Sequence, residues 1–173
     1  MDRLSSFRLA SFALAASLCS AGLGHAQTAA KPIGVNYVAA TERLHTAGQP
    51  DAATLATLGE QGFELVINLA PPNNQGAVAD EGKLVAEHGP TYEDFELFSA
   101  VMNGARDRKV LVHCQLNMRA SAFTFLYRVI DEHVPPEEAM KALSAVWIPK
   151  DQWATFTADV LKRNNIDFQL PKP

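Results

Sequence analysis

The residues best suited to chemistry are Cys114 and Arg119, which follow an apolar run that ends at His113. This pattern predicts a buried strand, a short loop and then the first turn of a helix. The backbone N–H groups of such a loop, together with the positive end of a helix dipole, suit an anion. The same setting favours the thiolate form of cysteine, and arginine adds a planar fork of donors for anionic oxygens. The stretch therefore predicts a nucleophile beneath a phosphate-shaped nest.

The expected reaction is the two-step cleavage of a phosphate ester. Cys114 attacks phosphorus and water then hydrolyses the thiophosphoryl intermediate, while Arg119 and the loop amides stabilise the transition state. We expect the Ser121 hydroxyl to bond Cys114 and His113 to orient the loop by hydrogen bonding. The remaining positions predicted to contact phosphate are Gln115, Leu116, Asn117 and Met118. No cofactor is predicted, and the other histidines lack the spacing of metal ligands.

The N-terminus has the pattern of a cleavable export signal. Arg3 and Arg8 accompany an alanine-rich apolar stretch over 9–19, and Gly24-His25-Ala26 supplies small residues where cleavage would occur. We therefore predict a signal peptide over 1–26, a linker over 27–34 and a phosphatase-like domain over 35–170. The expected location is periplasmic or secreted, without stable membrane insertion after cleavage.

Charge and cysteine content narrow the chemistry further. Cleavage would change the formal net charge from −4 to −5, which argues against a nucleic-acid partner. Cys114 would be the one cysteine left, in a compartment where structural cysteines come in pairs. A lone cysteine is a candidate reactive thiol, although an inert buried cysteine is the alternative.

Strand and helix patterns alternate along the chain. Strands are expected at 35–38, 44–46, 63–69 and 109–113, with Leu65-Val66-Ile67 as a buried run and 109–113 at the centre. Helices are expected at 51–60, 78–88, 119–132, 135–147 and 152–164, and one more begins near Thr91. Pro50 is expected at the first position of helix 51–60, and Asp94 is expected to complete a capping box with Thr91. This order predicts an α/β fold with a mostly parallel central sheet flanked by helices.

Three motifs in this order resemble the bacterial protein-tyrosine-phosphatase-like family, which is related to the phosphatase-like domain of beta-lactamase-hydrolase-like proteins. They are Gly48-Gln49-Pro50, Val66-Ile67-Asn68-Leu69, and Val112-His113-Cys114 with Arg119-Ala120-Ser121. The resemblance implies a dual-specificity-phosphatase-like fold, with Cys114 as nucleophile and Arg119 as phosphate-binding residue. The leading interpretation is an exported cysteine phosphatase that acts on a phosphorylated protein or a small phosphoester.

Two departures from the usual tyrosine-phosphatase pattern lie in the loop itself, and relatives in the resembled family share the first of them. Four residues separate Cys114 from Arg119, where most tyrosine phosphatases have five. The loop contains no glycine, and Asn117 stands where glycine is usual. Because asparagine tolerates a positive φ better than most residues, we expect a left-handed backbone there. Leu116 and Met118 are expected to form an apolar rim.

A third departure concerns the general acid. The family leads us to expect a strand and an acid-bearing loop between the helix ending near Gly89 and the helix starting near Thr91. Here Gly89-Pro90-Thr91 joins the two almost directly. Glu93 and Asp94 are interpreted as helix-capping residues, so no general acid is assigned.

Two other functions remain open from the sequence. In a rhodanese-like sulfurtransferase, Cys114 would also end a buried strand and would carry a persulfide. In a catalytically weak pseudophosphatase, the same nest would bind an anion or a protein partner without turnover. The motif order before Cys114 favours the phosphatase, and the missing acid segment favours the pseudophosphatase.

Overall fold

The computed structural model describes residues 32–70 and 90–172. The strands are β1 (Val38–Ala39), β2 (Leu44–Ala47), β3 (Leu65–Asn68) and β4 (Val110–His113). The helices are α1 (Ala52–Thr57), α3 (Tyr92–Asn103), α4 (Met118–Ile130), α5 (Pro136–Ser144) and α6 (Asp151–Arg163). The helix expected at 78–88 lies outside the described residues.

The described strands form one sheet in the order β1-β2-β4-β3. β4 pairs in parallel with both β2 and β3, whereas β1 pairs antiparallel with β2. All four residues of β4 are buried, because this strand has a neighbour on each side and is covered on both faces. The structure thus confirms the predicted α/β class, the mostly parallel sheet and the central place of β4.

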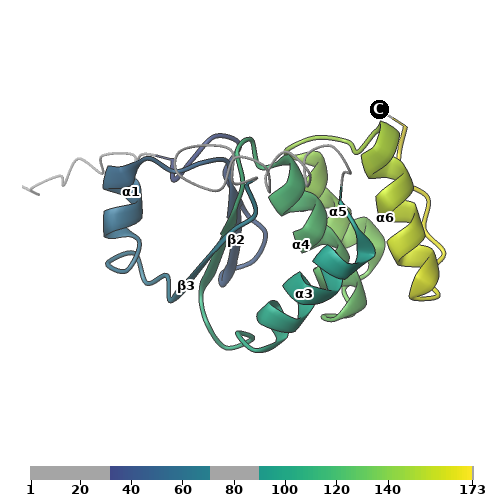
Figure 1. The fold of residues 1–173 in the computed structure, drawn as a ribbon, viewed down its shortest axis with the longest axis horizontal. Helices are drawn as coiled ribbons and strands as arrows, with labels where there is room; N and C mark the ends of the chain where they lie inside the picture. Colours follow the sequence, from purple (N-terminus) through teal and green to yellow (C-terminus); the bar gives the residue numbers. More distant parts are fainter. Residues whose placement is uncertain (1–31, 71–89, 173) are drawn as a thin grey trace, which may run out of the picture. The chain divides into compact units, whose positions relative to one another are not determined.

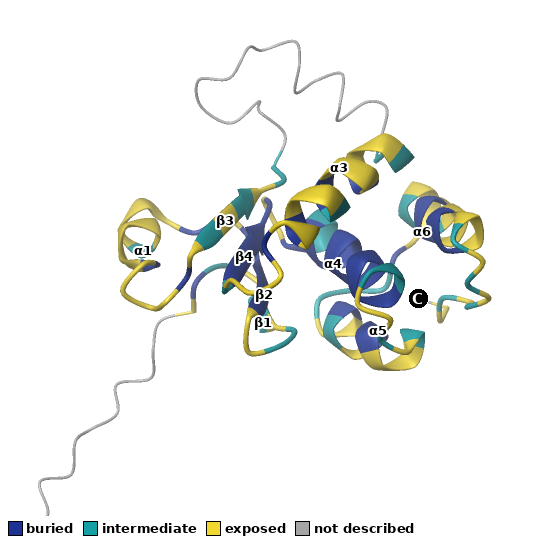
Figure 2. Ribbon diagram, turned by 90° about the horizontal axis from the view of Figure 1, so that it is seen from below, coloured by how far each residue is buried: buried dark blue, intermediate teal, exposed yellow. Residues whose placement is uncertain are grey.

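Helices cover both faces of the sheet, with α1 on one side and α3 to α6 on the other (Figure 1). The larger core lies on the second side, where α4 packs against α5, α6 and β4. Figure 2 shows that most of α4 and β4 is buried, whereas α1 is largely exposed. The smaller core beneath α1 joins Leu58, Phe63 and Leu111. The loop after β4 is therefore anchored at both ends by buried elements.

Two local predictions were wrong. The run Leu65-Val66-Ile67 is not continuously buried, because Val66 is 40% exposed. β3 is an edge strand of the sheet formed by the described residues; Leu65 and Ile67 pack on the larger core, while Val66 points to the opposite, poorly covered face. Pro50 is not the first helical residue, because Asp51 caps α1 by accepting a hydrogen bond from Thr54 N at 2.7 Å.

The start of α3 agrees with its prediction. The Thr91 hydroxyl accepts a hydrogen bond from Asp94 N, and the Asp94 carboxylate accepts one from Thr91 N at 3.0 Å. These bonds form a capping box. Phe95, Phe98 and Met102 of α3 are buried, whereas Val101 is 43% exposed.

Candidate active site

The loop Cys114–Arg119 connects the end of β4 with the start of α4. Cys114 is 5% exposed, and its backbone N–H donates to Ala47 O at 3.2 Å. The N–H groups of Gln115 and Leu116 have no hydrogen-bond acceptor among the described residues. Those of Met118 and Arg119 lie in the first turn of α4, where no acceptor within the helix exists. The loop therefore offers free amide donors beside a buried cysteine, as an anion-binding nest requires.

Asn117 gives the loop its shape. Its φ of 68° is left-handed, which confirms the expectation for this position. Its side chain is fully buried and donates to Asn36 O at 2.5 Å and to Thr46 Oγ1 at 3.0 Å. Because the Asn117 amide is used in these internal bonds, it supports the loop rather than facing a ligand. Asn36 reinforces the arrangement by donating from Nδ2 to Leu116 O at 3.1 Å.

The Gly48-Gln49-Pro50 motif supports the loop from below. Gln49 N donates to Gln115 O at 3.1 Å, and Gly48 forms a β-bridge with Leu116. A Cβ atom at Gly48 would lie 2.9 Å from Gln115 O and 2.9 Å from Val35 O. Glycine is therefore required here by close backbone approach, and the motif is a structural support of the site.

Substituting Gly48 should damage the site. In Gly48→Ala, backbone atoms must move to accommodate the methyl group, so we expect a loss of about 1–3 kcal/mol in the free energy of unfolding. Anion binding by the loop should weaken as well. Gly59→Ala is the matched control, because a Cβ at Gly59 meets nothing within 4 Å. Equal denaturant midpoints for the two variants would contradict this account.

Arg119 is held by contacts from two other elements. Its Nη1 donates to Leu69 O at 2.9 Å, just after β3, and its Cζ lies 5.9 Å from the centre of the Trp153 ring on α6. The other guanidinium N–H groups have no partner among the described residues, and no described carboxylate forms an ion pair with Arg119. Arg119 is therefore positioned by a carbonyl and an aromatic ring, with donors left for an anion.

Two predicted side-chain roles are not reproduced. The Ser121 hydroxyl donates to Met118 O at 3.1 Å, within its own helix, instead of to Cys114. Nδ1 of His113 is buried without a hydrogen-bond partner among the described residues, so it does not orient the loop by a bond from that atom. The backbone of His113 contributes instead, because its carbonyl accepts from Leu69 N at 2.7 Å. The remaining loop positions are Gln115, Leu116 and Met118. Gln115 and Leu116 are exposed at the rim, with Leu116 at 50%, whereas Met118 is half-buried.

Burial of His113 should make the stability of the protein pH-dependent. Desolvation lowers the pKa of His113 below its usual 6.5, so the native state keeps the ring neutral. As the pH falls below about 6.5, the unfolded chain binds a proton at this ring that the native state does not yet bind. The free energy of unfolding therefore decreases until the pH reaches the lower pKa of the native state. His45 adds to the effect, because burial lowers its pKa too.

The contribution of His113 can be isolated by substitution. The free energy of unfolding of His113→Asn should fall less between pH 7 and pH 5 than that of the unsubstituted protein. Urea denaturation at several pH values measures this difference. His45→Asn serves as a comparison, since it retains the contribution of His113 to the pH dependence. A pH dependence that His113→Asn leaves unchanged would show that this ring does not carry it.

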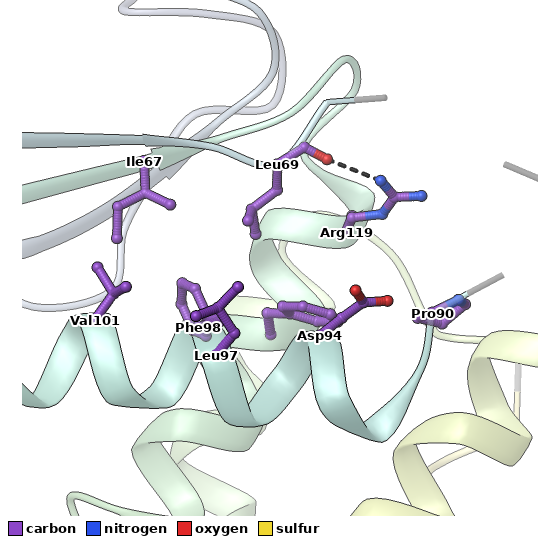
Figure 3. Close-up of a pocket in the computed structure, with 9 residues that line it drawn as sticks. Ile67, Leu69, Pro90, Asp94, Leu97, Phe98, Val101 and Arg119 are labelled. Carbon is purple, nitrogen blue, oxygen red and sulfur yellow. Dashed lines mark hydrogen bonds between the residues drawn. The ribbon is translucent and has the colours of Figure 1, made fainter. Parts of the chain in front are cut away.

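A pocket of about 240 Å³ lies beside the loop, between β3 and α3. Figure 3 shows Arg119 and Asp94 facing this pocket near the same end, from α4 and α3 respectively. Cys114 does not line it.

Three contributions to the site were not predicted from the sequence: the Leu69 carbonyl, the Trp153 ring and the internal partners of Asn117. A backbone carbonyl leaves no signal in a sequence, and the others depend on contacts between distant segments.

No helix in the described part of the chain is both long enough and apolar enough to cross a bilayer. No group of three or more histidine, cysteine, aspartate or glutamate side chains in residues 32–70 and 90–172 is arranged to hold a metal ion.

Comparison with known proteins identifies the fold and the family. No family model and no curated protein matches the chain. Among solved structures, two are of a DUF442 protein from Shewanella putrefaciens CN-32 that is named as a candidate phosphatase. One is 30% identical with a TM-score of 0.57, covering 75% of this chain and 92% of that chain. The other is 29% identical with a TM-score of 0.59, covering 75% and 93%.

More distant structures share the fold. Tk-PTP in its active form is 15% identical with a TM-score of 0.55, covering 75% of this chain and 95% of that chain. Human DUSP28 is 15% identical with a TM-score of 0.56, covering 79% and 99%. These matches confirm the dual-specificity-phosphatase-like fold that the sequence motifs implied. The chain belongs to the DUF442 family of protein-tyrosine-phosphatase-like proteins.

Proposed function

We propose that this protein is an exported, cysteine-dependent phosphatase that acts on phosphotyrosine-like or small phosphoester substrates. The loop Cys114–Arg119 is the observation that supports this most. It combines a cysteine at the end of the central strand, free amide donors and an arginine with unused N–H groups. The relatedness to a DUF442 candidate phosphatase supports the same chemistry.

The proposed reaction has two steps. The Cys114 thiolate attacks phosphorus, the ester P–O bond breaks, and the leaving oxygen takes the electron pair. Water then attacks phosphorus, the P–S bond breaks, and phosphate leaves with the thiolate restored. Arg119 and the amides of the loop hold the non-bridging oxygens through both steps, stabilising charge where it develops. No side chain is assigned to protonate the leaving oxygen.

Intact mass spectrometry tests the nucleophile directly. Brief treatment of the protein with an aryl phosphate, followed by acid quenching, should add one phosphoryl group, and Cys114→Ser should show no adduct. Treatment with thiosulfate distinguishes the sulfurtransferase, because that enzyme would gain one sulfur atom at Cys114. A sulfur adduct without a phosphoryl adduct would overturn the phosphatase proposal.

One observation favours a second function, that of an anion-binding module without turnover. Asp94 is the described carboxylate that lines the pocket beside Arg119, and it is engaged in the capping box of α3. Without a proton donor, cleavage of a poor leaving group is slowed by about 10²–10⁴-fold, so such a ligand would be bound and released unchanged. Phosphate binding by calorimetry together with undetectable aryl phosphate hydrolysis would identify this second function.

Export is a separate part of the proposal. The pattern Gly24-His25-Ala26 leads us to expect that the mature protein begins at Gln27, within a residue or two. Expression of the full chain followed by N-terminal sequencing of the exported material measures this directly. A mature protein that keeps Met1, or one acylated at Cys19, would contradict the prediction.

A further inference from the structure

The pocket between β3 and α3 is apolar along most of its length. Its apolar walls are formed by Ile67, Leu69, Leu97, Phe98, Val101 and Phe123. Figure 3 shows Ile67 and Val101 at the end far from Arg119. The pocket therefore begins next to the candidate phosphate-binding residue and runs along the edge strand away from it.

On its outer side β3 has no neighbouring strand among the described residues. Leu97 is 69% exposed and Val101 is 43% exposed, on the wall formed by α3. Scattered exposed apolar side chains are ordinary in soluble proteins. Here they line one concavity together with a cation, which is the composition of a ligand site.

The polar end of the pocket favours an anion. Arg119 uses one N–H group to hold Leu69 O, and it forms no ion pair with a described carboxylate. Asp94 lies at the same end, but its Oδ2 accepts the Thr91 N–H and caps α3. The positive end of the α3 dipole offsets the charge of that carboxylate. The cation with spare donors is therefore Arg119.

We propose that this pocket binds the hydrocarbon group of an amphipathic phosphomonoester whose phosphate lies at Arg119 and the loop. The inference rests on the proposed function and names the substrate class of the same site. A volume of about 240 Å³ is slightly below the range of about 300–1,000 Å³ for drug-sized ligands. It suits a single alkyl chain or one aromatic ring, and it excludes a larger occupant such as a folded partner segment.

Binding to the full-chain Cys114→Ser protein tests the proposal without turnover. Calorimetry would compare inorganic phosphate, butyl phosphate and octyl phosphate. Complete burial of each added methylene should tighten binding about fourfold, and partial burial about twofold. We therefore expect the Kd for octyl phosphate to be at least about tenfold lower than that for butyl phosphate.

A matched pair of variants locates the effect. In the Cys114→Ser background, the double variant Leu97→Gln/Val101→Thr should reduce the ratio of the butyl to the octyl phosphate Kd to below about three. Leu55→Gln is the control, because Leu55 is a helical leucine of 39% exposure on α1 and lies outside the pocket. It should leave the ratio unchanged. Circular dichroism and thermal midpoints establish that each variant is folded.

Distinct results would overturn the inference. Equal affinities for butyl and octyl phosphate, with inorganic phosphate bound, would remove the pocket from the substrate site and leave the phosphatase proposal intact. A preference for octyl phosphate that the Leu97→Gln/Val101→Thr variant does not change would show that the octyl group binds outside this pocket. A dimer that this variant dissociates, seen by light scattering, would show that the pocket is an interface between copies. Failure of all three phosphates to bind would instead overturn the phosphate site itself.

Discussion

Cys114→Ser should lose hydrolysis of aryl phosphates by at least about 10³-fold while retaining phosphate binding. The hydroxyl is a far weaker nucleophile than the thiolate, so no thiophosphoryl intermediate forms. The amide donors of the loop and the Arg119 guanidinium are unchanged by the substitution, so the affinity for inorganic phosphate should stay within about threefold of its original value. Steady-state kinetics and calorimetry on the same preparation measure the two quantities.

Arg119 should behave differently from Cys114. In Arg119→Ala both binding and turnover should weaken, with a loss of about 10²–10³-fold in kcat/KM. Arg119→Lys should rescue little, because an ammonium lacks the planar pair of donors that spans two phosphate oxygens. Arg108→Ala is the matched control, since Arg108 is exposed and outside the site. Undiminished hydrolysis by Cys114→Ser, or a loss in Arg108→Ala equal to that in Arg119→Ala, would remove this mechanism.

The rate should depend steeply on the leaving group. Without an acid to protonate the departing oxygen, the transition state carries negative charge on that atom. The activation free energy therefore rises with the pKa of the leaving group. General acid catalysis usually contributes about 10²–10⁴-fold, so alkyl phosphates such as phosphoserine should react slower than activated aryl phosphates by at least that factor. A series of substituted aryl phosphates, with kcat/KM plotted against leaving-group acidity, measures the slope.

Substitutions of Glu93 and Asp94 test whether the protein lacks a general acid. Asp94 caps α3, so Asp94→Asn should change kcat less than about tenfold and should mainly lower stability, by about 1 kcal/mol. Glu93→Gln is the neighbouring control in the same helical turn. A fall of a hundredfold or more in Asp94→Asn, confined to poor leaving groups, would show that Asp94 supplies the proton. Its place in the pocket beside Arg119 makes this the informative alternative.

The parts of the site that depend on local chemistry could be predicted from the sequence. A run of apolar residues before His113 indicated the buried strand, and an asparagine in a glycine-free loop indicated the left-handed turn at Asn117. The capping box at Thr91 followed from two residue types at a fixed spacing. In each case the signal is a residue type or a short pattern within a few residues of the chain, although the bonds that hold Asn117 come from the distant Asn36 and Thr46.

The remaining features depend on contacts between distant segments. The exposure of Val66 is set by the edge position of β3, which the strand itself does not encode. The hydrogen bond from the Ser121 hydroxyl to Met118 O is local, yet it was not predicted. The hydroxyl bonds within its own helix and not to Cys114. The carbonyl that holds Arg119 belongs to Leu69, fifty residues earlier. No residue type at position 69 could have indicated that role.

The internal bonds of Asn117 have a consequence for how activity arises during folding. Asn117 bonds Asn36 across 81 residues and Thr46 across 71 residues of sequence. Contacts of such high contact order form only after the entropy of closing a long loop has been overcome. The candidate phosphate nest is therefore completed only when the segment around Asn36, early in the described chain, meets the loop after β4. A partly folded intermediate with β4 and α4 in place, but without the segment around Asn36, would hold Cys114 in position without the loop shape that anion binding requires.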